Sequence, residues 1–117
     1  MLLLLPGLCI GNLSYVTLGN IVITENNNGD ISNGANETIT LTAPAGIEFQ
    51  AGTGSGSVSG TGATFGSVVV TNSTITFTAS LSGGSNSNIN TITINGINVR
   101  ATSLVSSVTL TRTGGTM

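Results

Sequence analysis

The sequence has no histidine and a single cysteine, Cys9, so it lacks the parts of a catalytic triad or a structural zinc site. It also has no lysine, and its only cations are Arg100 and Arg112. With a net charge of -2, it offers no basic stripe for a phosphate backbone, which argues against nucleic-acid binding. One cysteine cannot form an intrachain disulfide. We interpret Cys9 as a packed or incidental thiol, with an intermolecular link as the alternative.

Aromatic and charged residues are also scarce, at 3% and 5% of the chain. Disordered chains combine low hydrophobicity with high charge, whereas the mean hydropathy here is +0.42. The composition is dominated by Thr, Ser, Asn and Gly mixed with Val, Ile and Leu. Thr and Ile suit a pleated, half-buried surface, and Gly and Asn suit tight turns. At 117 residues, the chain is therefore expected to form one all-β domain.

Turn-forming residues interrupt runs of alternating apolar and polar residues along the chain, and no window has a helical period. This pattern predicts an antiparallel, Ig-like β-sandwich of about eight or nine short strands over residues 13–117. A hairpin is expected across Asn72-Ser73, with Ile75 and Phe77 facing inward. The expected strands are Leu13–Leu18, Asn20–Thr24, Thr38–Ala43, one beginning at Ile47, Phe65–Thr71, Thr74–Ala79, Asn90–Ala101 and Val105–Thr111.

Three segments depart from simple alternation. Residues 25–36 carry two Asn-Gly dipeptides and are predicted to form turns. Residues 51–63 are rich in Gly and Ser, and we interpret them as a surface loop around a short strand at Val58. Between residues 90 and 101 the apolar phase changes at Asn95-Gly96, which predicts a bulge or a tight turn there.

Residues 1–12 form a separate apolar segment, which Pro6 interrupts. The segment is shorter than the roughly 20 residues that a membrane-spanning helix needs. It also lacks the basic start and the small-residue cleavage site of a secretion signal. Two interpretations stay open: the segment is the remnant of a signal, or it is a donor strand that fills a groove in its own domain or in a neighbour. If extended, it presents one apolar face, made of Leu2, Leu4, Leu8 and Ile10.

Charge is also scarce where soluble β-proteins commonly use it, which is to protect exposed sheet edges. With two cations and four carboxylates in the whole chain, the edges are either capped by loops or meant to pair with another chain. Little net charge keeps copies apart, so such a protein would be an aggregation hazard in the cytosol. We therefore expect an extracellular or cell-surface location.

Four phrases occur in order along the chain: LGNIVITE at 18–25, LTAPAGIEF at 41–49, ITINGINVRAT at 92–102 and LTRTGGT at 110–116. Together they resemble the β-strand repeat modules of very large secreted surface proteins, which are common in Bacteroidota and related bacteria. The resemblance implies an Ig-like sandwich, an extracellular location and a structural or adhesive role without known catalysis. It supplies no functional residues. A single module with a leucine-rich start differs from a tandem repeat and favours a subunit that polymerises.

The acidic residues offer one candidate metal site. Glu25, Asp30 and Glu37 are weak candidates for a loose Ca²⁺ site, because calcium prefers oxygen ligands. The spacing does not match the twelve-residue calcium loop, so a turn rich in Asx residues is the preferred interpretation. No other cofactor is predicted. The glycine-rich stretch 52–62 has no following Lys or helix, so it does not match a phosphate-binding loop.

Two further sets of residues are candidates for surface roles. Arg100 and Arg112 are expected to form surface or interfacial ion pairs with Glu25 or Glu48. The Asn-x-Ser/Thr pattern occurs three times, which makes three asparagines candidates for N-glycosylation in a suitable host. These asparagines are Asn12, Asn36 and Asn72.

The leading functional hypothesis is a non-catalytic structural subunit of an extracellular filament or surface assembly, whose partners are copies of itself. Copies would associate through β-strand pairing at sheet edges, with residues 1–12 entering the next subunit. The alternative is an adhesin-type binding module that recognises a glycan or a surface protein through the loops Gly83–Asn88 or Ala51–Gly62. Enzyme activity is not predicted, because nothing sets two carboxylates in one cleft.

Overall fold

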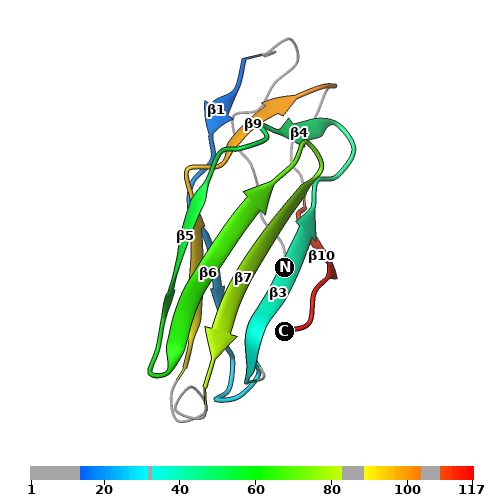
Figure 1. The fold of residues 1–117 in the computed structure, drawn as a ribbon. Coiled ribbons are helices and arrows are strands. Elements are labelled where there is room, and N and C mark those ends of the chain that lie inside the picture. The colour runs from blue at the N-terminus through cyan, green and yellow to red at the C-terminus, as the bar shows by residue number, and fades with distance from the viewer. Residues whose placement is uncertain (1–13, 32, 83–88, 104–108) are drawn as a thin grey trace.

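The computed structural model describes residues 14–31, 33–82, 89–103 and 109–117 (Figure 1). These residues contain no helix, and every sheet in them is antiparallel, which confirms the all-β prediction. The strands of the described residues are β1 Val16–Thr17, β2 Ile21–Thr24, β3 Gly34–Thr42, β4 Ile47–Phe49, β5 Ser55–Ser59, β6 Ala63–Val70, β7 Thr74–Leu81, β8 Thr91–Asn95, β9 Asn98–Ala101 and β10 Thr111–Gly114.

The strands form three sheets, ordered β1-β9-β4, β2-β8-β5 and β10-β3-β7-β6. Figure 1 shows the four-stranded sheet in front of β2-β8-β5, with β1-β9-β4 at the upper end. Because β1 leads into β2 and β8 leads into β9, the two three-stranded sheets follow one another along one side of the molecule. The arrangement is that of a β-sandwich. Its Ig-like character stays a prediction.

The centre of the sandwich is built on strict alternation in β3 and β7. Ile39 pairs with Phe77 and Leu41 with Ile75, and all four side chains are buried in the core. Burial of one such side chain contributes about 1.5–3 kcal/mol. The intervening positions are threonines that face outward and are half-buried. The predicted hairpin across residues 72–73 and its inward side chains are therefore confirmed.

The glycine-rich stretch is more ordered than the sequence suggested. The expected short strand at Val58 is the five-residue strand β5, which pairs along its whole length with β8. Its glycine is required by packing: a Cβ added to Gly56 would lie 2.7 Å from the Phe77 ring and 3.2 Å from that of Phe65. The predicted short strand is confirmed, and turns at residues 51–52 and 61–62 flank it. Its length was not predicted, because a glycine that admits a neighbouring ring looks the same in sequence as one in a flexible turn.

Two strand boundaries also differ from expectation. β3 begins at Gly34, inside the segment predicted as turns, because a bulge between Gly34 and Glu37 absorbs the extra residues. Asn36 takes a positive φ of 56° in this bulge, a conformation that Asn tolerates better than most residues. The last strand begins at Thr111, whereas the prediction ended there. Leu110 is nevertheless fully buried, as expected of a core position.

The phase change at Asn95-Gly96 marks a change of sheet. β8 ends at Asn95 and pairs with β2 and β5, whereas β9 begins at Asn98 and pairs with β1 and β4. Gly96 has a φ of 69° and Ile97 is buried between the two strands. The predicted irregularity is confirmed, and its consequence is that one continuous segment serves two sheets.

Candidate functional site

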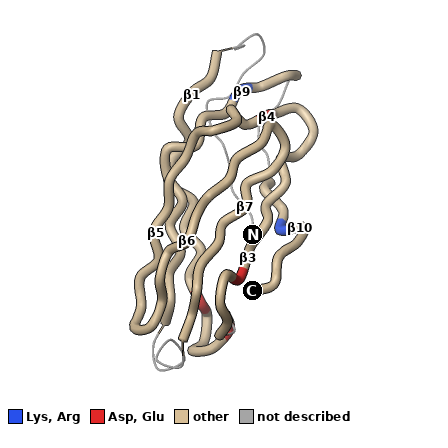
Figure 2. Tube along the Cα trace, viewed as in Figure 1, with Lys and Arg blue, Asp and Glu red and all other residues tan. Residues whose placement is uncertain are grey.

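Four strands at the ends of sheets contain no charged residue (Figure 2). They are β1, β2, β5 and β6, and each is the last strand of its sheet. They instead carry most of the exposed large apolar side chains of the described residues: Val16 on β1, Val22 on β2, and Phe65 and Val69 on β6. Val22 is 54% exposed and Val69 is 58% exposed. Apolar, uncharged edge strands favour pairing with another chain, so these edges are the candidate site.

Sequence reasoning missed Val22 and Val69 as contact residues, although a signal was present. In β2, Val22 lies between the inward-facing Ile21 and Ile23 and therefore faces outward, where a polar residue is usual. In β6, three consecutive valines must turn one side chain outward, and that one is Val69. Alternation therefore predicts which apolar residues of a strand face outward. Only the sheet order shows which of those strands are edges.

Among the described residues, β2 and β10 are end strands of their sheets and face one flank of the sandwich. A cavity of about 230 Å³ lies there between the two layers of the sandwich. Its apolar lining comes from Ile23 of β2, from Ile31 in the following turn, and from Ile39 and Leu41 of β3. Ile31, Ile39 and Leu41 belong to the core, so the cavity reaches the core from the side of the sandwich. We call this feature the β2–β10 groove.

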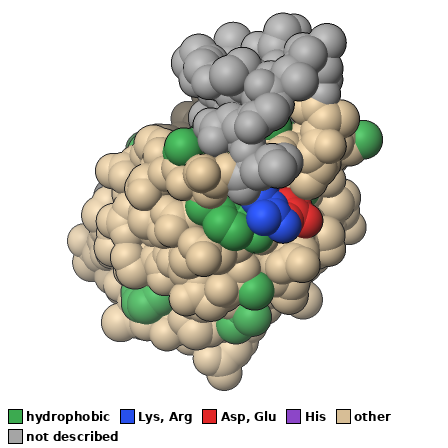
Figure 3. Space-filling view, turned by 90° about the horizontal axis from the view of Figure 1, so that it is seen from above, with side chains coloured by type: hydrophobic (Ala, Val, Ile, Leu, Met, Phe, Trp, Pro, Cys, Tyr) green, Lys and Arg blue, Asp and Glu red, His purple; other side chains and the backbone are tan. Residues whose placement is uncertain are grey.

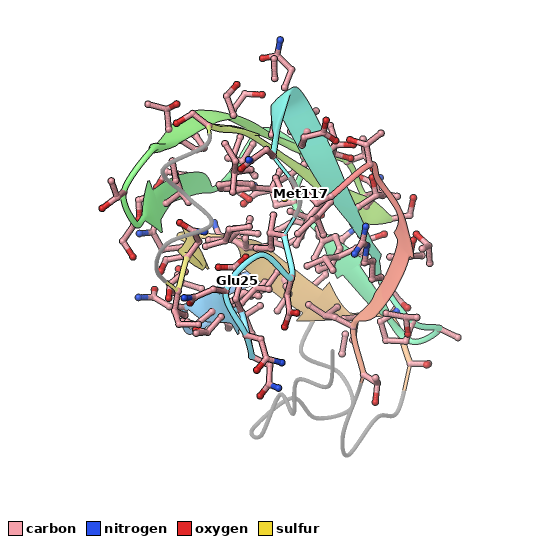
Figure 4. The ribbon with its side chains drawn as sticks, turned by 90° about the horizontal axis from the view of Figure 1, so that it is seen from below. Glu25 and Met117 are labelled. Carbon is pink, nitrogen blue, oxygen red and sulfur yellow. The ribbon has the colours of Figure 1, made fainter. Side chains whose placement is uncertain are left out.

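The β10 side of this groove is protected by a charge. Arg112 is the cross-strand partner of Leu41 and lines the groove, and it is exposed, so this edge strand carries a cation at the rim of the groove. Its Nε donates to the carbonyl oxygen of Gly114 at 3.3 Å, and its Nη2 donates to the main-chain oxygen of Met117. The Met117 side chain, labelled in Figure 4, packs against the core. Charged side chains on an edge strand are a known protection of sheet edges, so β2, which has none, is the less protected strand of this flank.

The opposite flank is closed by close approach of the main chain. β5 lies beside β6 there, and the Gly52 amide donates to the carbonyl oxygen of Val70 at 3.2 Å. A Cβ added to Gly54 would overlap the Ile97 side chain. The two layers therefore meet along β5 and β6. Glycines make this close approach possible because they have no side chain to hold the layers apart. The outer face of β6 remains exposed at Val69.

One cluster of charged and aromatic side chains lies on the β1-β9-β4 sheet. Glu48 and Arg100 are cross-strand partners and form an ion pair, as expected for this pair. The Arg100 guanidinium lies over the Tyr15 ring at 4.7 Å, and the Tyr15 hydroxyl donates to Glu48 Oε1 at 3.4 Å. Figure 3 shows a basic and an acidic group side by side on a face that is otherwise uncharged. Arg112 instead bonds main-chain oxygens, so the expected pairing with Glu25 or Glu48 was wrong for this residue.

Glu25 serves the fold as an internal acceptor. It is only 6% exposed, at the end of β2 (Figure 4), and its Oε1 accepts from the Ile31 amide at 2.8 Å. Its Oε2 accepts from the Asn90 amide at 2.6 Å and from Asn90 Nδ2 at 2.9 Å. Asn90 is fully buried and in turn accepts from the Glu25 amide at 3.1 Å. The carboxylate therefore ties the turn after β2 to the start of β8.

The other carboxylates of the candidate calcium site are placed differently. Asp30 Oδ2 accepts from the amides of Asn26 and Asn27 at 3.1 and 2.8 Å, which closes the turn as the Asx interpretation expected. Glu37 lies on β3, where its carboxylate is packed over the Gly34 main chain. Within the described ranges, no group of three or more His, Cys, Asp or Glu side chains could hold a metal ion.

The remaining candidates are partly outside the described residues. Asn36 and Asn72 are both exposed, the first in the β3 bulge and the second in the β6–β7 hairpin turn. The loop 83–88, Cys9, Asn12 and the assembly residues Leu2, Leu4, Leu8 and Ile10 lie outside the described residues. No helix in the described part is long or apolar enough to cross a membrane.

Comparisons with known proteins identify no relative: no family model, curated protein or solved structure matches this chain. The resemblance to secreted repeat modules therefore stays a prediction from the four phrases. Any statement about function has to be argued from the geometry of the strand edges and the groove.

Proposed function

We propose that the protein is a non-catalytic structural subunit of an extracellular filament or surface assembly, in which copies associate by β-strand pairing. The observation that carries this proposal is the placement of exposed valines on uncharged edge strands, Val22 on β2 and Val69 on β6. An edge strand offers a row of main-chain donors and acceptors, and an exposed valine adds apolar area that pairing would bury.

The two edges lie on opposite flanks of the sandwich. β2 borders one flank together with β10, and β6 borders the other together with β5 (Figure 1). An association between different surfaces of identical molecules continues indefinitely unless a rotation closes it into a ring. Opposite edges with the same apolar character are therefore suited to an open chain of subunits.

The extracellular location rests on charge. A net charge of -2 gives little repulsion between copies, and four edge strands, β1, β2, β5 and β6, have no charge to prevent pairing. The adhesin alternative has less support, because most of one proposed recognition loop, residues 51–62, is turn and strand β5 packed on the sandwich. The other proposed loop lies outside the described residues.

The test places single lysines on the edges. Val22→Lys and Val69→Lys are each expected to raise the concentration at which polymers form, as measured by sedimentation and electron microscopy. Pairing would bury the exposed half of each valine, about 0.8–1.7 kcal/mol on the scale of a fully buried valine. Loss of that energy alone raises the critical concentration roughly 4- to 18-fold.

The matched controls put the same charge on the neighbouring interior strand. Thr93 is the cross-strand partner of Val22, and Thr76 is the partner of Val69. Both threonines are half-buried on strands that already have two neighbours. Thr93→Lys and Thr76→Lys should leave assembly unchanged within about twofold of the wild type, since a surface substitution away from the interface has little effect. Equal effects of edge and interior lysines would refute the proposal, as would a wild-type chain that stays monomeric.

A further inference from the structure

We infer that the β2–β10 groove receives an apolar strand from a second copy of this chain, and that this strand is formed by residues 1–12. The inference rests on the proposed function and names both the edge that is used and the segment that enters it. It is carried by the shape and lining of the groove, by the difference between its two borders, and by the chemistry of the segment.

The groove suits inserted side chains better than a small ligand. Its volume of about 230 Å³ is below the roughly 300–1,000 Å³ of typical small-molecule sites. Its deep lining is aliphatic, with Ile31, Ile39 and Leu41 from the core, and its charged lining residues are Asp30 and Arg112. An extended chain beside β2 would place every second side chain into such a groove while its main chain pairs with the edge.

The two borders of the groove are not equivalent. At β10 the space is already used: Arg112 bonds the Gly114 and Met117 main-chain oxygens, and the amides of Thr116 and Met117 both donate to the Thr38 carbonyl oxygen, at 2.9 and 3.1 Å. Within the part of the chain that the structure describes, β2 pairs only with β8, and its outward valine is exposed. A new strand would therefore pair with β2 and extend the β2-β8-β5 sheet.

The chain itself contains a segment with matching chemistry. Residues 1–12 carry no charged side chain, so their entry would leave no unpaired charge in the groove. In an extended strand, the even positions Leu2, Leu4, Leu8 and Ile10 would share one face, while Leu3 and Leu5 would share the other. Fully extended, twelve residues span about 40 Å. The molecule measures 48, 25 and 20 Å along its principal axes, so the segment is longer than the two shorter dimensions and can reach a copy placed side by side with its own domain.

This arrangement makes a specific prediction for Cys9. In β2, Ile21 and Ile23 face inward and Val22 faces outward. With the even residues of the inserted strand in the groove, Cys9 would face outward on the same surface as Val22. Neighbouring antiparallel strands have Cα atoms about 4.5–5.5 Å apart, within the range that a disulfide spans. The native cysteine can therefore report the contact.

The experiment mixes two forms of the full chain. Donor chains keep Cys9 and have no other cysteine. Acceptor chains carry Cys9→Ser together with one new cysteine at an outward position of the β2 edge: Val22→Cys, or Asn20→Cys and Thr24→Cys to cover the neighbouring registers. Mild oxidation after assembly, followed by mass spectrometry of the linked peptides, identifies the pairs. The matched control is Cys9→Ser with Asn72→Cys, an exposed position in the β6–β7 turn, outside the strands proposed to pair.

We expect at least one β2 acceptor to link to donor Cys9 at ten or more times the yield of the Asn72→Cys control. Polymers that form normally while no β2 acceptor exceeds the control would overturn this inference and leave strand pairing as the function intact. Mixtures that never polymerise would overturn both. A single chain with Cys9 and Val22→Cys that links only within itself, at any concentration, would show that the segment fills its own groove, which also overturns the inference.

Discussion

Replacing Glu25 with glutamine tests whether a buried carboxylate holds the lower end of the sandwich together. Glu25 is 6% exposed and accepts three N–H bonds, two of them from Asn90, which is 65 residues away in sequence. Glutamine has one oxygen in place of two. If its carbonyl oxygen keeps the two bonds to Asn90, its amide group must face the Ile31 amide, which is also a donor.

The cost follows from that mismatch. A buried donor left without an acceptor costs about 1–3 kcal/mol. With a urea m-value of about 2 kcal/mol/M, the unfolding midpoint of Glu25→Gln should fall by roughly 0.5–1.5 M, with m unchanged. Glu25→Ala removes the acceptor from all three donors and should lower the midpoint further.

The matched control is Glu37→Gln, the same chemical change at a half-buried carboxylate on β3. It should shift the free energy of unfolding by no more than about 0.5 kcal/mol. Equal midpoints for the two variants would refute the role of Glu25 as a buried acceptor. Unfolding in millimolar Ca²⁺ separates this role from the metal-ligand alternative: the midpoint of the wild type should not change. A calcium-dependent gain that Glu25→Gln removes would favour the metal site.

Two other substitutions test the packing and the surface charges. Gly56→Ala should destabilise the fold by about 1–3 kcal/mol, because its Cβ would press on the Phe77 and Phe65 rings. The control is Gly19→Ala, whose Cβ would have nothing within 4 Å. Equal unfolding midpoints for the two variants would contradict the close approach of β5. Glu48→Gln should lower the free energy of unfolding by no more than about 1 kcal/mol, since the Arg100–Glu48 pair is partly exposed, and the decrease should be smaller in high salt. A decrease of several kcal/mol that salt does not alter would contradict this interpretation.

Local patterns in the sequence predicted the parts of the fold that depend on neighbours in the chain. Alternation in Thr38–Ala43 identified the inward faces of Ile39 and Leu41, and a turn at residues 72–73 identified the hairpin. Both signals are contained within a few residues, so no knowledge of the tertiary structure is needed to read them.

Features that depend on distant partners could not be read in the same way. The space above Gly56 is occupied by Phe77, and the acceptors on Glu25 are used by Asn90. Neither partner is close in sequence. The phase change at Asn95-Gly96 was visible, but only the pairing of β8 and β9 with different strands explains it. The candidate site was predictable in kind, as uncharged edges, but which strands form those edges is a property of the sheet order.

The most direct test of strand pairing is hydrogen exchange of the main-chain amides of β2 and β6, compared between assembled and dissociated protein. Pairing between copies forms new main-chain hydrogen bonds. We therefore predict that the β2 and β6 amides that have no hydrogen-bond partner within their own sheet exchange slowly only in the assembled state. Amides of the interior strands β7 and β8 should exchange equally slowly in both states. Polymers in which the β2 and β6 amides exchange as fast as in the monomer would contradict the account.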